Sequence, residues 1–182
     1  MKCYFEKQFS NVRQRAIFER MEQTFSFTVN GTSRSVTTDP ERPLLEVLRE
    51  EFQISGPKYG CGEGQCRACT ILLNGKSVAS CVTPVGDVDK KEIVTIEGLA
   101  KGDKLHSVQQ AFLHEGAFQC GYCTAGMILG AVALLKEKPN PSEADIRSRM
   151  QRHICRCCSY VRIIKAVQRA AKESGKVEAS GR

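Results

Sequence analysis

The feature of this sequence that most constrains its fold is a cysteine-rich loop at residues 60–69, Gly-Cys-Gly-Glu-Gly-Gln-Cys-Arg-Ala-Cys. Its three cysteines, Cys61, Cys66 and Cys69, are followed downstream by Cys81. A C-x4-C-x2-C run with a fourth, later cysteine is a spacing that holds a [2Fe-2S] cluster, and soft thiolates suit iron and sulfide. A structural zinc site is the alternative. Zinc loops usually come as paired C-x2-C or Cys/His sets, and no histidine lies near this loop.

Glycines alternate with the other residues at the start of this loop, at Gly60, Gly62 and Gly64. Glycine adopts positive φ angles without a steric penalty. We therefore expect positive φ at all three, in a backbone that folds around the cluster and points N–H groups at its sulfurs.

A second set of cysteines lies in the C-terminal half, as Cys120-Gly121-Tyr122-Cys123 and Cys155-Arg156-Cys157. Each pair precedes a predicted helix, and helix N-termini offer free N–H groups that suit an anionic cluster. The two pairs together predict a second four-thiolate site, for which structural zinc is again the alternative. Cys158 makes the last ligand ambiguous, and we favour Cys157.

The ten cysteines of this 182-residue chain do not resemble a disulfide scaffold. Eight fall into the two sets, and the N-terminus contains no secretory apolar segment. We therefore expect reduced thiols and a cytoplasmic location, with Cys3 as a free surface thiol. No apolar run approaches the roughly 20 residues that span a bilayer, which predicts no membrane span.

The formal net charge of +7 is concentrated at the ends of the chain, above all in residues 141–182. A basic C-terminal helix can indicate nucleic-acid binding, but no aromatic interleaving and no nucleic-acid motif accompanies it. A docking face for an acidic partner, or a solvated helix face, explains the charge better.

Up to residue 100 the pattern predicts a small mixed sheet packed on one helix. Two β-hairpins are indicated by Asn30-Gly31 and Asn74-Gly75, each between alternating apolar residues. Between them a helix opens at Pro43 and is expected to stop at Ser55-Gly56-Pro57. A closing strand is predicted at residues 93–96.

After residue 100 the apolar period becomes helical, with stripes over residues 105–113, 127–135, 146–150 and 160–171. Ser142 to Asp145 form a capping signal for the third of these helices. The fold class is therefore α+β, and four amphipathic helices with short connections suggest a bundle. We divide the chain into a disordered extension at 1–20, domains at 21–100 and 101–174, and a disordered tail at 175–182.

The two cysteine sets, with Phe118-Gln119 before Cys120 and Ile154 before Cys155, resemble the small iron-sulfur subunit of the xanthine dehydrogenase family of molybdenum hydroxylases. The resemblance covers residues 24 to about 172. It implies a β-grasp, plant-type ferredoxin-like N-terminal domain and a C-terminal four-helix bundle, each holding one [2Fe-2S] cluster.

Carried over residue by residue, the resemblance implies ligands and a direction of electron flow. The outer cluster would be held by Cys61, Cys66, Cys69 and Cys81, and the inner one by Cys120, Cys123, Cys155 and Cys157. Gln119 matches the position that faces molybdopterin in a large subunit. Electrons would run from molybdenum through the inner and then the outer cluster to a cytochrome, a quinone or an FAD subunit. The chain would thus be the iron-sulfur subunit of an oxidoreductase.

Three positions depart from the commonest family pattern. Arg67 stands where glycine is usual, Ala125 replaces a proline, and Cys158-Ser159-Tyr160 replaces Thr-Gly-Tyr. The last resembles the Gly-Thr-Tyr variant of small subunits of isoquinoline oxidoreductase, nicotinate dehydrogenase and related aldehyde dehydrogenases, and Val161-Arg162-Ile163 agrees with that branch. Because a cation favours the more negative reduced cluster, Arg67 is expected to raise the potential of the outer cluster.

The chain offers no general base for hydroxylation, so no residue is assigned a catalytic role. Its histidines, His106, His114 and His153, lie on helical stretches and are expected to be solvated or in the core. Two other functions stay open. A free-standing two-cluster ferredoxin would need no docking patch, and a zinc-bound interaction module would be redox-silent.

Overall fold

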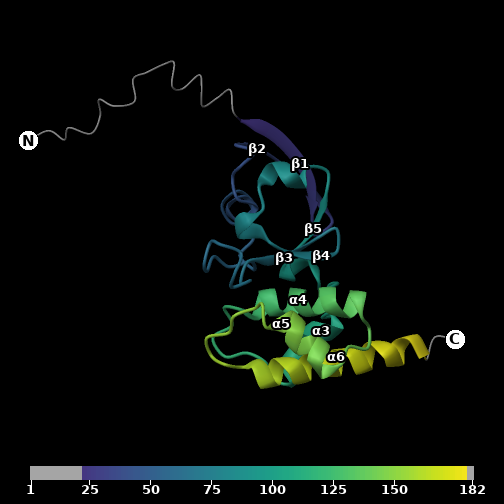
Figure 1. Cartoon of the computed structure of the whole chain (residues 1–182). Coiled ribbons are helices and arrows are strands. Elements are labelled where there is room, and N and C mark those ends of the chain that lie inside the picture. Colours follow the sequence, from purple (N-terminus) through teal and green to yellow (C-terminus); the bar gives the residue numbers. More distant parts are fainter. Residues whose placement is uncertain (1–21, 180–182) are drawn as a thin grey trace, which may run out of the picture.

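The computed structural model describes residues 22–179, with a sheet in the N-terminal part and helices in the C-terminal part (Figure 1). Cys3 and the predicted extension at 1–20 lie outside the described residues, as do residues 180–182. The α+β class is confirmed. No helix of the described part is long and apolar enough to cross a membrane.

The sheet has five strands in the order β2-β1-β5-β3-β4, with β1 and β5 parallel and the other neighbours antiparallel. Both predicted hairpins are confirmed. Asn30 and Gly31 have φ of 51° and 79°, and Asn74 and Gly75 have 48° and 80°, as a type I′ turn requires. The strands are β1 (Gln23–Val29), β2 (Thr32–Thr38), β3 (Thr70–Leu73), β4 (Lys76–Ala79) and β5 (Glu92–Val94).

The helix predicted between the two hairpins packs on this sheet, and it ends earlier than the sequence predicts. It starts as α2 (Leu44–Glu46), directly after Pro43, and continues as a π-helical stretch over Val47–Glu51. The Phe52 N–H then donates to the Val47 carbonyl, and Gln53 turns left-handed with φ of 57°. This left-handed turn lets the Ile54 N–H donate to the Leu48 carbonyl at 2.8 Å, and the chain leaves the helix before Ser55-Gly56-Pro57.

The C-terminal part contains α3 (Ser107–His114), α4 (Thr124–Glu137), α5 (Glu143–Met150) and α6 (Tyr160–Ala179). The predicted capping signal is confirmed, because Ser142 and Asp145 form a reciprocal capping box at the start of α5. Helix α6 continues beyond residue 174, where we placed the end of the domain. A regular four-helix bundle stays a prediction, since α3 and α5 have only 8 residues each.

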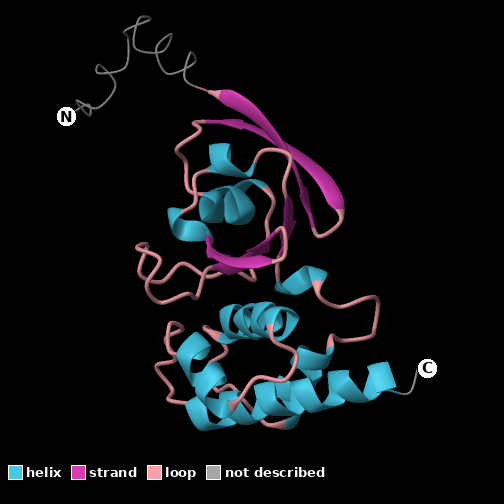
Figure 2. Ribbon diagram, turned by 45° about the vertical axis from the view of Figure 1, so that its right-hand side comes forward, coloured by secondary structure: helices cyan, strands magenta, loops and turns pink. Residues whose placement is uncertain are grey.

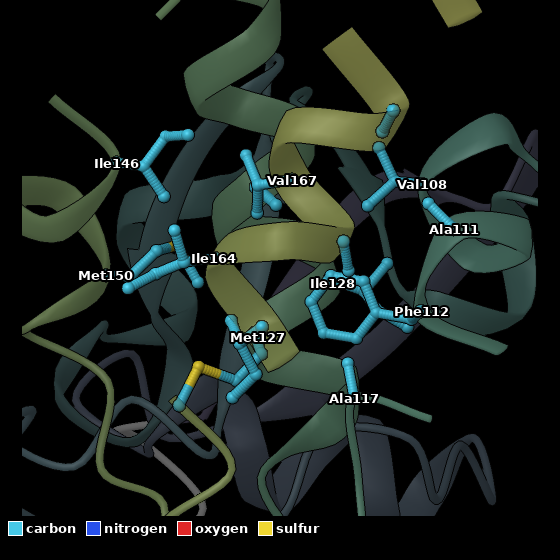
Figure 3. Packing of buried hydrophobic residues seen from close by; sticks show 14 of the residues in the cluster. Val108, Ala111, Phe112, Ala117, Met127, Ile128, Ile146, Met150, Ile164 and Val167 are labelled. Atoms are coloured by element: carbon cyan, nitrogen blue, oxygen red, sulfur yellow. The ribbon is translucent and has the colours of Figure 1, made fainter. Parts of the chain in front are cut away.

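These helices share one apolar core (Figure 3). Phe112 of α3 is 1% exposed and packs in a cluster with Met127 of α4, Ile146 of α5 and Val167 of α6. Burial of such side chains contributes roughly 1.5–3 kcal/mol each. The core therefore fixes the ends of the helices, and with them the loops that carry the second cysteine set.

Helix α4 also joins the two parts of the molecule, lying between the sheet and the other helices (Figures 1 and 2). Leu129 and Ala133 of α4 pack on Leu72 of β3. A Cβ atom on Gly126 would stand only 2.3 Å from the carbonyl oxygen of Arg67. The glycine thus permits the helix to lie directly against the first cysteine loop.

We predict that Gly126→Ala destabilises the protein by about 1–3 kcal/mol, because the added methyl group meets rigid backbone instead of a flexible side chain. Chemical unfolding compared with the wild type measures the effect. An unchanged or increased stability, as the helix propensity of alanine alone would give, contradicts the packing described for α4.

Candidate metal centres

The first cysteine set lies on the loop before β3 and on the turn after β4, which the second hairpin brings together. Four backbone N–H groups of this loop point at cysteine sulfurs of the set, and donors to the sulfurs of the cluster itself stay a prediction. Glu63 and Cys66 donate to Cys61 Sγ at 3.3 and 3.4 Å, Cys61 donates to Cys66 Sγ at 3.4 Å, and Gly64 donates to Cys81 Sγ at 3.3 Å. Such donors stabilise thiolate over thiol.

The glycines of the loop have two different roles. Gly62 and Gly64 have φ of 74° and 69°, as expected. The expectation was wrong for Gly60, which does not adopt positive φ. A Cβ on Gly60 would lie 2.7 Å from Cys66 Sγ, so here the absence of a side chain makes room for the sulfur.

The sulfurs of the first set form two pairs. The Cys61 side chain interacts with that of Cys66, and Cys69 interacts with Cys81. The N–H groups of Cys66 and Glu63 lower the pKa of Cys61 to about 7, whereas burial raises the pKa of Cys69 to about 11. One pair therefore faces solvent and the other lies in the interior.

The second set also forms two pairs, Cys120 with Cys157 and Cys123 with Cys155. Cys123 is the N-cap residue of α4, as the sequence predicted for a helix N-terminus. The Tyr122 N–H, followed by the Cys157 side chain, lowers the pKa of Cys120, and burial raises the pKa of Cys123 to about 12. The structure thus reproduces the arrangement of the first set, with one exposed and one more buried pair.

Cys157, and not Cys158, faces Cys120. The Cys158 side chain is exposed, its Sγ lies 3.9 Å from the Arg156 carbonyl oxygen, and its φ is 58°. This left-handed residue turns the chain between Cys157 and α6. The geometry therefore favours Cys157 as the fourth ligand, which stays a prediction.

Sequence reasoning missed the contacts between the two sets. The Ile154 N–H donates to the Cys66 carbonyl at 3.0 Å, and the Tyr122 hydroxyl donates to the Tyr59 carbonyl. The Tyr160 hydroxyl, assigned only to a core stripe, accepts from the Cys155 N–H at 2.8 Å. No spacing in the sequence signals the first two contacts, because they depend on how α4 places one domain on the other.

The histidines have the roles expected of solvated or core residues. His106 caps α3, His114 is exposed, and His153 is buried at 5% exposure. Burial, and then the nearby Arg67, lowers the pKa of His153 to about 4, so the ring is neutral at physiological pH. Gln119 is exposed beside Cys120, and its predicted contact with molybdopterin stays a prediction.

The arrangement of thiols fits a two-iron cluster better than a single ion. A [2Fe-2S] cluster is held by four cysteines spread over two irons, and each set provides two pairs. The N–H donors fit a group that bears negative charge on sulfur.

Comparison with known proteins agrees with this geometry. The chain matches a 2Fe-2S iron-sulfur cluster binding domain over residues 27–96 and a [2Fe-2S] binding domain over residues 95–168. It is 44% identical over 149 residues to the nicotinate dehydrogenase small FeS subunit of Eubacterium barkeri, covering 82% of this chain and 95% of the relative. It is 47% identical over 149 residues to the alpha chain of isoquinoline 1-oxidoreductase of Brevundimonas diminuta, covering 81% of this chain and 97% of that relative.

The chain belongs to the small iron-sulfur subunits of the xanthine dehydrogenase family. Its cofactors are accordingly two [2Fe-2S] clusters.

Solved structures of this family share the fold. Quinoline 2-oxidoreductase of Pseudomonas putida superposes with a TM-score of 0.81 at 38% identity, covering 86% of this chain and 97% of that chain. The aldehyde oxidoreductase of Desulfovibrio desulfuricans gives 0.80 at 41% identity, covering 85% of this chain and 17% of that chain. In that enzyme the part that matches this chain is therefore a small portion of a much longer polypeptide.

We predict that Cys157→Ser abolishes the second cluster and lowers the iron content from about four to about two per chain, because serine replaces a soft ligand. Cys158→Ser, the matched control, keeps both clusters. Iron analysis and EPR of the reduced protein measure this. The opposite result for the two variants would assign the ligand to Cys158.

We predict that Arg67→Gly lowers the midpoint potential of the first cluster, because the cation beside the ligand loop no longer stabilises the reduced form. The side chain lines an open cleft of about 420 Å³ together with Glu63, so screening is expected to moderate the shift. Potentiometric titration measures it, with Arg67→Lys as the charge-preserving control. An unchanged midpoint in Arg67→Gly rules out the electrostatic role.

Proposed function

We propose that this subunit relays electrons from a molybdopterin-bound molybdenum centre in a large subunit to an external acceptor, during hydroxylation of an N-heterocycle, a purine or an aldehyde. Each [2Fe-2S] cluster supplies a one-electron couple when bound. The ligands in this proposal are Cys61, Cys66, Cys69 and Cys81 in a β-grasp ferredoxin-like domain, and Cys120, Cys123, Cys155 and Cys157 in a four-helix-bundle domain.

The observation that carries the proposal is the hydrogen bond from the Ile154 N–H to the Cys66 carbonyl, 3.0 Å between N and O. Cys66 belongs to the first set, and Ile154 directly precedes Cys155 of the second set. A continuous path of covalent bonds and one hydrogen bond therefore joins a thiol of each set. A chain whose metals served only to stabilise two separate domains would not need this connection.

The surface near the second set supports a permanent partner. Four apolar side chains that flank these cysteines in the sequence are exposed: Phe118 by 37%, Tyr122 by 50%, Ile154 by 53% and Val161 by 66%. Large exposed apolar side chains near a functional site are typical of protein interfaces. A free-standing ferredoxin, the main alternative, would have to leave them in water.

The exposed Gln119 and Cys120 lie within this same surface. In the proposal, they face the molybdopterin of the large subunit. The first set, with its exposed Cys61, then passes electrons to the acceptor, for which a cytochrome, a quinone and an FAD subunit are the candidates. A cytoplasmic location is part of the proposal, because free thiols persist in a reducing compartment.

The proposal is tested on the complex purified through a tag on this chain. We expect a molybdenum-containing large subunit to co-purify, about four irons per small subunit, and two distinct EPR signals that both appear on adding the substrate of the complex. Dithionite reduction serves as the positive control for the signals. Two outcomes contradict the proposal. A protein that purifies alone with two reducible clusters is a free-standing ferredoxin, and a colourless protein that contains zinc is a structural module.

A further inference from the structure

One buried hydroxyl beside the second cysteine set has no protein partner. Among the side chains that the structure describes, only two buried nitrogen or oxygen atoms lack a hydrogen-bond partner, Thr124 Oγ1 and His153 Nδ1. The other ring nitrogen of His153 lies 3.5 Å from Thr70 Oγ1, on the side of the sheet domain. Thr124 directly follows Cys123 and makes no side-chain hydrogen bond at all.

The position of Thr124 on α4 directs its side chain toward the cysteines. It is the first residue of the helix, and it shares a face with Met127 and Ile128, three and four residues later. Both of these residues pack in the same apolar cluster as Cys155. Because Cα–Cβ bonds tilt toward the helix N-terminus, the hydroxyl is directed to the end of α4 that carries Cys123.

A threonine at the start of a helix commonly caps the helix, but Thr124 does not. The N-cap position belongs to Cys123, and the backbone N–H of Thr124 already donates to the Gly121 carbonyl at 3.1 Å. A buried water needs two to four polar partners, whereas the helix face shared by Thr124 is apolar at Met127 and Ile128. A buried hydroxyl without a partner is destabilising, which indicates that its partner is a group other than the protein.

We propose that the Thr124 hydroxyl donates an O–H···S hydrogen bond to a sulfur of the second [2Fe-2S] cluster and thereby raises its reduction potential. The inference rests on the function proposed above. Reduction adds negative charge to the cluster, so a donor stabilises the reduced form more than the oxidised form, and hydrogen bonds to sulfur are among the factors that set such potentials. Thr124 is not a ligand, so its removal leaves the four thiolates in place.

The test is an EPR-monitored redox titration of the complete complex with Thr124→Val and Thr124→Ser. Valine keeps the shape of threonine and removes the hydroxyl, whereas serine keeps the hydroxyl. We expect the midpoint of the second cluster to become more negative in Thr124→Val and to stay near the wild-type value in Thr124→Ser. The first cluster in the same molecule is the internal control, and its midpoint should not move.

Two results overturn the inference: an unchanged second midpoint in Thr124→Val, or equal shifts of both clusters, which indicate a general structural change. If Thr124→Val does not assemble the second cluster, Thr124→Ala is titrated and interpreted in the same way. Pulsed EPR of protein exchanged into D2O gives an independent readout. An exchangeable deuteron coupled to the second cluster should be present in the wild type and in Thr124→Ser, and absent in the valine or alanine variant.

The failure of this inference differs from a failure of the proposed function. If the complex has two reducible clusters and neither potential changes when Thr124 is replaced, the electron relay still holds. Only the proposed hydroxyl contact is then contradicted. If the reduced protein gives no EPR signals, the proposed electron relay itself is contradicted.

Discussion

The direct contact between α4 and the first cysteine loop is the constraint on which the rest of the structure depends. Gly126 brings the helix against the Arg67 carbonyl, and the Ile154 N–H reaches the Cys66 carbonyl. The loops that carry the two cysteine sets are joined by this hydrogen bond, and α4 contacts both the sheet and the other helices. A bulkier residue at Gly126 would separate the domains, and neither cysteine motif alone could restore their connection.

Local features of this chain were predictable because their causes are local. The Asn-Gly turns require left-handed residues, Ser142 caps α5 through its own side chain, and the cysteine spacing fits one cofactor. What depends on distant segments was not predictable. The bond from Ile154 to Cys66 and the close approach of Gly126 to the Arg67 carbonyl arise from tertiary packing, which no short pattern contains.

Two of the departures from the family pattern occur at left-handed backbone positions. Arg67 has φ of 61° and Cys158 has φ of 58°, each next to a predicted ligand. Left-handed conformations cost a residue with a Cβ roughly 1–2 kcal/mol. The ligand loops of both sets therefore keep their shape against a local preference, and the surrounding hydrogen bonds and cofactor contacts must offset this cost.

The placement of α4 also affects the timing of electron transfer. Its N-terminal end meets the first cysteine loop at Gly126, and near its C-terminal end the Lys136 side chain covers Gly75 of the second hairpin. Because Leu129 and Ala133 of the same helix also pack on Leu72 of the sheet, we expect the two domains to keep one relative position. The separation of the two redox centres is then constant, and transfer between them should follow a single rate instead of the spread that flexible two-domain carriers show.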